Sequence, residues 1–174
     1  LLVLKAKYAD SRRTYITYED GEINLEDLIK NEQCVITMTN LGYIKRTSLD
    51  MYHSQNRGGK GIKGIETREE DYVKQLFIAS SHDYLLFFTN RGRVYRMKAY
   101  EIPEAGRTAR GTAIVNLLSL SGGEQVSAVI QMKESRDKGY LLMATKGGTI
   151  KKTDLAEYGN IRTNGLVAIS LQEG

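Results

Sequence analysis

The sequence predicts an all-β protein: a propeller-like array of about three four-stranded antiparallel blades, with a short helical connector at its N-terminus. One sequence motif occurs three times, at residues 34–46, 84–96 and 140–152. It consists of an apolar run, a turn ending in glycine and a basic segment. The repeat spacing is about 50 residues, which is typical of arrays that build one small sheet per repeat. A content of 17 glycines and one proline suits a chain rich in hairpins.

The N-terminal residues differ from the repeats. Leu1, Leu4 and Tyr8 have helical spacing, which predicts a helix within residues 1–10. We interpret residues 1–24 as a connector that arrives from an upstream domain, and residues 25–174 as the partial array.

Each copy of the repeated motif predicts a β-hairpin. Its apolar run is too short for most helices and is rich in β-forming residues. Gly42, Gly92 and Gly148 close the three turns, where glycine supplies the positive φ that a tight hairpin needs.

Two further strands complete each predicted blade. Residues 71–78 align with residues 124–130, and the second segment alternates apolar and polar residues, as a strand with one face on a core does. A glycine and an apolar stretch follow each hairpin, at residues 61–67, 111–117 and 165–170. We therefore expect contiguous blades near residues 25–67, 68–118 and 119–174.

Composition limits the class of protein. The 174 residues are 41% hydrophobic, enough for a packed core, but three repeats are fewer than the roughly four to eight blades that close a propeller. We expect an open arc, cut from a longer chain, with exposed strand edges. The single cysteine, Cys34, excludes an intrachain disulfide and favours a reducing compartment. His53 and His82 are isolated, so no metal site is expected, and no apolar stretch approaches the length of a membrane span.

Positive charge is concentrated in the repeats. The net charge is +4 and the isoelectric point about 9.1, although residues 10–32 carry more acidic than basic side chains. Equivalent positions of an array lie at equivalent places on its rim, so repeated basic residues would form a stripe that follows a polyanion such as DNA. Charge alone fits ordinary solvated hairpin residues equally well. The predicted rim residues are Lys45, Arg46, Lys63, Arg91, Arg93, Arg96, Lys98, Arg107, Arg110, Lys146, Lys151, Lys152 and Arg162.

A glycine-basic cluster follows the first hairpin, with the sequence Gln55-Asn56-Arg57-Gly58-Gly59-Lys60-Gly61. Its glycines let the backbone approach a phosphate and offer N–H groups, while the basic and amide side chains supply charge and donors. Taken alone, the cluster is more simply a glycine-rich turn with incidental charge. Combined with the basic repeats, it favours a contact with a DNA backbone.

The same cluster resembles the gyrase A box, the signature of the C-terminal domain in the A subunit of DNA gyrase. It departs from the usual form at Asn56, where a basic residue is common. The resemblance covers nearly the whole chain and extends through residues 10–14, 43–47, 86–95 and 144–148.

The resemblance implies a β-pinwheel, usually of six blades, in which neighbouring blades exchange strands and double-stranded DNA wraps around a basic perimeter. Residues 107–111 and 162–165 would be degenerate equivalents of the box. The parent would be a bacterial, cytoplasmic type II topoisomerase, a homodimer of A subunits joined by two B subunits. ATP and Mg²⁺ would bind elsewhere in that holoenzyme, which adds negative supercoils, so no cofactor is expected here.

Catalysis by the chain itself is not expected. DNA cleavage by such enzymes needs a tyrosine nucleophile next to arginine and acidic residues that hold Mg²⁺. The sequence has no Arg-Tyr pair, and its 11 tyrosines fall mostly in predicted strands, where packing explains them. The densest acidic group, Glu69, Glu70 and Asp71, is interpreted as a solvated blade edge.

Two other functions stay open. One is the corresponding domain of topoisomerase IV, which does not wrap DNA and in which the box is usually eroded. The other is a propeller that serves as a protein-interaction platform, with its charge incidental.

Overall fold

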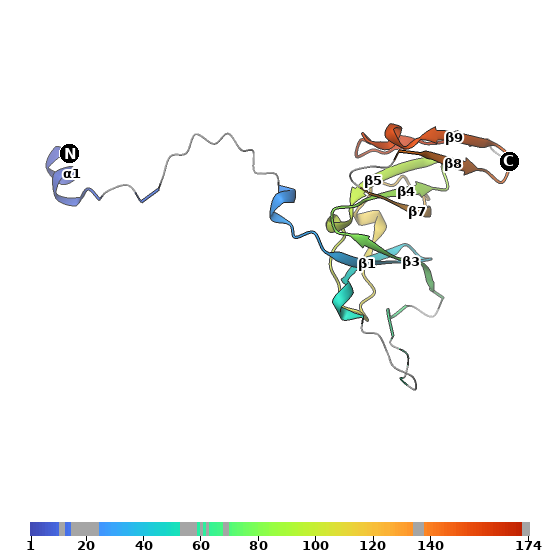
Figure 1. The fold of residues 1–174 in the computed structure, drawn as a ribbon, viewed down its shortest axis with the longest axis horizontal. Helices are drawn as coiled ribbons and strands as arrows, with labels where there is room; N and C mark the ends of the chain where they lie inside the picture. The colour runs from blue at the N-terminus through green and yellow to red at the C-terminus, as the bar shows by residue number, and fades with distance from the viewer. Residues whose placement is uncertain are drawn as a thin grey trace.

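The computed structural model describes residues 1–10, 13–14, 25–52, 59, 61, 63–67, 70–133 and 138–171. It is a mostly β structure (Figure 1). The strands are β1 (Gln33–Thr39), β2 (Tyr43–Ser48), β3 (Val73–Ser80), β4 (Tyr84–Thr89), β5 (Arg93–Lys98), β6 (Thr112–Ala113), β7 (Val126–Met132), β8 (Tyr140–Ala144), β9 (Ile150–Asp154) and β10 (Leu166–Val167). The helices are α1 (Leu2–Tyr8) and the short 3-10 helices η1 (Leu25–Leu28), η2 (Leu49–Met51), η3 (Ala99–Glu101), η4 (Ile114–Asn116) and η5 (Leu155–Tyr158).

The predicted N-terminal helix is confirmed as α1, in which every residue is exposed. No helix in the described ranges is both long enough and apolar enough to cross a membrane.

The three predicted hairpins are confirmed as β1–β2, β4–β5 and β8–β9. The turn glycines Gly42, Gly92 and Gly148 have φ values of 84°, 72° and 81°. Thr39 begins the first turn, where its hydroxyl accepts a hydrogen bond from the Tyr43 amide at 3.2 Å. Equivalent threonine hydroxyls accept from the amides of Arg93 and Thr149. This bond explains why threonine recurs before each turn.

Strands are exchanged between repeats. The first sheet has the order β3-β1-β2-β6 and the second β10-β5-β4-β7, while β8 and β9 form a third sheet. The strand that precedes each later hairpin therefore pairs with the hairpin before it, and β6 and β10 likewise return to the preceding hairpin. The sheets do not correspond to contiguous ranges near 25–67, 68–118 and 119–174. Aligning the repeats cannot distinguish strands that pair within one repeat from strands exchanged between neighbouring repeats, because the two arrangements have the same period.

The last strand of each predicted blade is shorter than expected. Of the stretches at 111–117 and 165–170, only two residues each form a strand, β6 and β10. After β6 the chain enters η4. The described part of residues 61–67 is not a strand.

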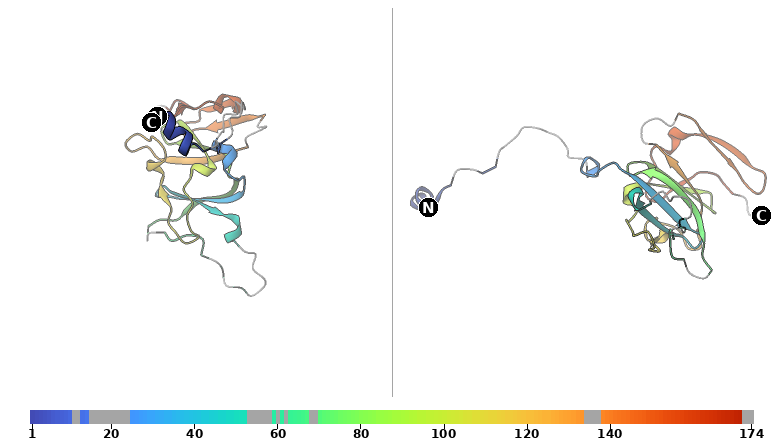
Figure 2. Two further views of the ribbon diagram at one scale, coloured as in Figure 1. Left: turned by 90° about the vertical axis from the view of Figure 1, so that its left-hand side faces the viewer. Right: turned by 60° about the horizontal axis from the view of Figure 1, so that its bottom comes forward.

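The hairpins stack as successive layers, which Figure 2 shows from two other sides. Ile36 and Ile44 of the first sheet share one core with Leu85 and Phe87 of the second. The opposite face of the second sheet, with Leu86 and Val94, forms a second core with Leu141 and Met143 of β8. A middle sheet buried on both faces leaves little room for solvated side chains on β4 and β5.

The third sheet ends the stack with an open face. Leu142 and Ile150 are 67% and 68% exposed, whereas their counterparts in the second repeat, Leu86 and Val94, are fully buried. Among the described residues β8 pairs only with β9, so its other edge is unpaired and the expected exposed strand edge is present.

Candidate nucleic-acid interface

The glycine-basic cluster lies mostly outside the described residues. Gln55, Asn56, Arg57, Gly58 and Lys60 are among those not described, while Gly59 and Gly61 are exposed. A side chain added at Gly61 would meet nothing within 4 Å. The role of the cluster in DNA contact therefore stays a prediction.

The segment that follows the cluster lies against the corresponding loop of the next repeat. An Arg107 Nη1 hydrogen donates to the Lys63 carbonyl oxygen at 2.9 Å, and the Glu66 amide donates to the Thr108 carbonyl at 2.8 Å. Lys63 and Arg110 are exposed, and Arg107 is half-buried. We call Lys63, Arg107 and Arg110 the first basic cluster. Two loops about 45 residues apart in sequence thus share one patch of positive charge.

Glu66 partly offsets the charge of this cluster. Its Oε1 lies 3.0 Å from Lys63 Nζ, with both side chains exposed. The hydrogen bond and charge of Lys63, followed by the charge of Arg110, hold the pKa of Glu66 below its ordinary value. Because the pair is exposed, salt and a phosphate group can compete with it readily.

A second basic cluster occupies the equivalent place one layer further on. An Arg93 Nη2 hydrogen donates to the Asn164 carbonyl at 2.6 Å, and the exposed Arg162 begins the turn that contains Asn164. We call Arg93 and Arg162 the second basic cluster. Residues 107–111 and 162–165 were expected to be equivalent, and both loops lie on the second strand of the preceding hairpin.

Glycine is required where each of these loops crosses the strand. Gly111 and Gly165 have φ values of +92° and +74°. A Cβ at Gly111 would lie 2.4 Å from the Ile44 carbonyl oxygen, and one at Gly165 would lie 2.8 Å from the Tyr95 ring. No side chain fits at either position, so the loop backbone lies directly against the strand backbone at Gly111 and against the Tyr95 ring at Gly165.

The other predicted rim residues lie in three kinds of surroundings. Lys146 is exposed at the tip of the third hairpin, and the exposed Arg91 donates to the Gly122 carbonyl. Arg46 and Arg96 are half-buried: Arg46 pairs with Glu104 at 3.3 Å, and Arg96 lies over the Tyr84 ring. The exposed Lys152 stacks on the Tyr140 ring, and Lys151 donates to the Ala168 carbonyl at 2.6 Å.

Two predicted rim residues lie inside the protein instead. Lys45 is fully buried and donates to the carbonyl oxygens of Gly64, Gly106 and Arg107. Lys98 is 4% exposed and donates to Glu26 Oε1 at 2.6 Å and to the His82 carbonyl at 2.9 Å. Their expected place on the rim is wrong. Loops and η1 cover these strand positions, and a buried ammonium group needs acceptors on every side.

Sequence reasoning missed two buried carboxylates that brace the hairpin turns. Asp71 Oδ1 accepts from the Leu41 amide at 2.9 Å. Glu124, at the aligned position, accepts from the Thr89 hydroxyl at 2.7 Å. Burial alone would raise both pKa values, but hydrogen bonds from backbone amides and from hydroxyl groups bring them below their ordinary values.

Asp71 was expected at a solvated edge with Glu69 and Glu70, yet it is only 7% exposed. Glu70 is exposed, as expected, and Glu69 lies outside the described residues. The signal that reveals the difference is the alignment of Asp71 with Glu124, since a solvated residue has no reason to recur at one place of the repeat.

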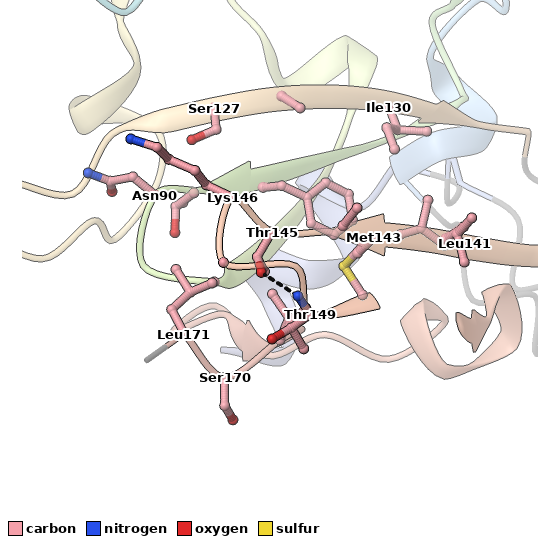
Figure 3. Close-up of a pocket in the computed structure, with 18 residues that line it drawn as sticks. Asn90, Ser127, Ile130, Leu141, Met143, Thr145, Lys146, Thr149, Ser170 and Leu171 are labelled. Carbon is pink, nitrogen blue, oxygen red and sulfur yellow. Dashed lines mark hydrogen bonds between the residues drawn. The ribbon is translucent and has the colours of Figure 1, made fainter. Parts of the chain in front are cut away.

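An apolar pocket lies between the second sheet and β8 (Figure 3). Ile130, Leu141, Met143 and Leu171 line it, with Lys146 from the hairpin tip. The corresponding space between the first two sheets is filled by apolar residues of η4 and the loop that follows it, namely Ile114, Leu117 and Leu118. We therefore interpret the pocket as a gap between two layers of the stack.

Among the described residues there is no group of His, Cys, Asp or Glu able to hold a metal.

Comparison with known proteins identifies relatives for this arrangement. A family model described as "DNA gyrase C-terminal domain, beta-propeller" matches residues 35–80, 83–131 and 139–174. The chain is 52% identical over 170 residues to the DNA gyrase A subunit of Clostridium acetobutylicum, covering 98% of this chain and 20% of that protein. It is 50% identical over 168 residues to the DNA gyrase A subunit of Mycolicibacterium smegmatis, covering 97% and 20%. The chain thus spans about a fifth of the length of these relatives.

Two solved structures share the fold. The C-terminal domain of DNA topoisomerase IV matches with a TM-score of 0.69 and 28% identity, covering 83% of this chain and 44% of that one. The DNA gyrase A C-terminal domain matches with a TM-score of 0.65 and 28% identity, covering 82% and 45%. Strand-exchanged sheets, basic loops at equivalent places and a family match over most of its length agree: the chain belongs to the DNA gyrase C-terminal domain family of beta-propellers.

Proposed function

We propose that this chain is the DNA-binding and DNA-wrapping module of a gyrase A subunit. One observation carries the proposal. At each of the two described crossings, the basic loop of one repeat lies on the second hairpin strand of the repeat before it. Exposed cations therefore advance from layer to layer, as a surface that follows a DNA backbone requires. The curated relatives are A subunits of DNA gyrase, which supports the same function.

The two basic clusters and Lys146 supply the charge that binds DNA. Duplex DNA carries one phosphate charge about every 1.7 Å of axis, and a cation that neutralises a phosphate releases a bound counterion. Such contacts position the duplex without reading its sequence. Bending a short site costs on the order of 1–6 kcal/mol, so several cations on successive layers must act together.

The module contributes to the reaction by geometry and leaves the chemistry to other parts of the enzyme. In the proposed holoenzyme two A and two B subunits combine in the bacterial cytoplasm. ATP and Mg²⁺ bind outside this module and drive strand passage. The wrap presents a neighbouring DNA segment for that passage, which makes the supercoils negative.

The linking number of ligated DNA tests this proposal. Nicked circles are sealed in the presence of the full-length protein in complex with its B partner, and the topoisomers are counted. We expect the wild type to shift the linking number and the variant Arg57→Ala/Lys60→Ala to lose the shift. The matched control Lys5→Ala/Lys7→Ala removes two cations from α1 and should keep it. An unchanged shift in the Arg57/Lys60 variant contradicts the proposal.

The second candidate is the corresponding domain of topoisomerase IV, which the fold match to that enzyme's domain supports. The glycine-basic cluster at residues 55–61 argues for gyrase, since the box is expected to be eroded in topoisomerase IV. A wild-type holoenzyme that binds DNA but produces no shift in linking number would favour this candidate.

A further inference from the structure

The Lys45 ammonium group joins two DNA-contact loops that belong to different repeats. It donates to the Gly64 carbonyl at 2.9 Å, in the segment that follows the glycine-basic cluster. It also donates to the Gly106 carbonyl at 3.2 Å and to the Arg107 carbonyl, both in the equivalent loop of the next repeat. An ammonium group has three hydrogens, and here each has a carbonyl acceptor.

This arrangement is unusual for a lysine in a basic protein. The side chain is fully buried, and its acceptors are neutral carbonyl groups. Burial, and then the charge of Arg107, lower the pKa of Lys45 from its ordinary value. Burying an ammonium group carries a desolvation cost that good hydrogen bonds offset. A residue in this position is suited to hold backbone segments together, and a phosphate cannot reach it.

The repeat supplies an independent copy of part of the contact. Lys151 occupies the position of Lys45 in the third hairpin, and it donates to the Ala168 carbonyl at 2.6 Å. Ala168 and Gly64 are equivalent, each lying three residues after the glycine that begins its stretch, Gly165 or Gly61. In the second hairpin the position holds Tyr95, whose hydroxyl donates to the Ser119 carbonyl at 3.2 Å. Lys45 and Lys151 thus reach equivalent backbone carbonyls of their own repeats, whereas Tyr95 reaches a carbonyl at a different position.

We propose that Lys45 is a positioning residue of the DNA-binding surface. It clamps the segment after the glycine-basic cluster to the equivalent loop of the next repeat, and so sets the spacing between the exposed Lys63 and the half-buried Arg107. These two residues adjoin or contain the acceptor carbonyls, and the Arg107 guanidinium group itself bonds to the Lys63 carbonyl. The clamp depends on the proposed function only for its effect on DNA.

Hydrogen exchange in the full-length protein tests the clamp without DNA. The reporter is the Glu66 amide, which bonds across the same two loops to the Thr108 carbonyl. Lys45→Met keeps the apolar stem of the side chain but removes its donors, and we expect faster exchange in peptides that contain Glu66. Lys146→Met is the matched control, since it removes an exposed cation at the tip of the third hairpin, away from the two loops, and protection should persist. Unchanged protection in Lys45→Met overturns the clamp.

A double-mutant cycle then separates positioning from general stability and from direct phosphate contact. We expect Lys45→Met to weaken the affinity of the holoenzyme for duplex DNA on the order of tenfold, by displacing cations that neutralise phosphates. In the background Lys63→Met/Arg107→Met the same change should have little further effect, because the cations that it positions are gone. An equal loss of affinity in both backgrounds overturns the positioning role. If the wild type binds no DNA while the exchange result holds, the clamp stands and the proposed function fails.

Discussion

Replacing Glu124 should destabilise the second hairpin more than any change at an exposed carboxylate. Glu124 is 4% exposed, and its carboxylate accepts from the Thr89 hydroxyl at 2.7 Å, the Ser121 amide at 2.9 Å and the Tyr95 hydroxyl at 3.2 Å. Tyr95 keeps the Ser119 carbonyl as an alternative acceptor, so two donors lose their partner in Glu124→Ala. Hydrogen bonds to a charged group contribute roughly 1.5–3 kcal/mol each, so for two such bonds we expect a loss of about 3–6 kcal/mol.

Urea unfolding of the chain, followed by far-UV circular dichroism at pH 7, measures this loss. Glu157→Ala is the control, because Glu157 is an exposed carboxylate in η5 and should change the free energy of unfolding by less than about 0.5 kcal/mol. A Glu124→Ala variant as stable as this control would refute the claim that the Glu124 carboxylate stabilises the hairpin turn.

The pH dependence of the free energy of unfolding is a second test of the role of Glu124. The folded-state pKa of Glu124 lies below its ordinary value of 4.5, so the ionised carboxylate stabilises the fold above that value. This contribution is lost as the pH falls through the folded-state pKa. Glu124→Gln carries no titrating group, so its stability should fall less than that of the wild type on acidification below about pH 5. Equal acid sensitivity in the two proteins would contradict the assignment.

Three further predictions concern single residues. Gly111→Ala should lower the free energy of unfolding by more than about 1 kcal/mol, because its Cβ would lie 2.4 Å from the Ile44 oxygen, whereas Gly106→Ala meets nothing within 4 Å and should be neutral in the same urea assay. Lys98→Met should cost about 2 kcal/mol by thermal unfolding, less than a fully buried pair because Glu26 keeps some solvent contact, while Lys63→Met, whose partner Glu66 is exposed, should leave the unfolding temperature nearly unchanged. Burial raises the pKa of the Cys34 thiol to about 11, so a thiol reagent at pH 8 should modify the unfolded chain rapidly and the folded chain hardly at all; equal rates would contradict its burial.

The sequence was sufficient for the local structure of the chain. Short apolar runs that end in a turn glycine predicted all three hairpins, and Leu1, Leu4 and Tyr8 predicted α1. The choice of partner for each flanking strand was not predictable from the pattern. A strand at residues 73–80 satisfies the same period whether it pairs with the hairpin before it or the one after it, and only packing selects β1.

The candidate site was predicted only in part, because the sequence pattern does not show which basic residues are buried by distant segments. Composition and spacing located the exposed cations Lys63, Arg110 and Arg162 in equivalent loops. They did not distinguish these from Lys45 and Lys98, because a basic residue on a strand can face either solvent or a ring of carbonyl groups from distant loops. The outcome depends on residues far away in sequence, namely 64, 106 and 107 for Lys45 and Glu26 for Lys98.

The salt dependence of DNA affinity tests most directly whether the exposed cations of successive layers form one DNA path. The measurement compares the wild-type holoenzyme with the variant Lys63→Met/Arg110→Met/Arg162→Met, recording log K for duplex DNA against log salt. The slope of log K against log salt is negative, and each lost phosphate contact makes it shallower by about 0.9. For the three substitutions together we predict a slope that is shallower by roughly 2.7. An unchanged slope would contradict the path, and no measurable affinity of the wild type at low salt would indicate a protein-interaction platform instead.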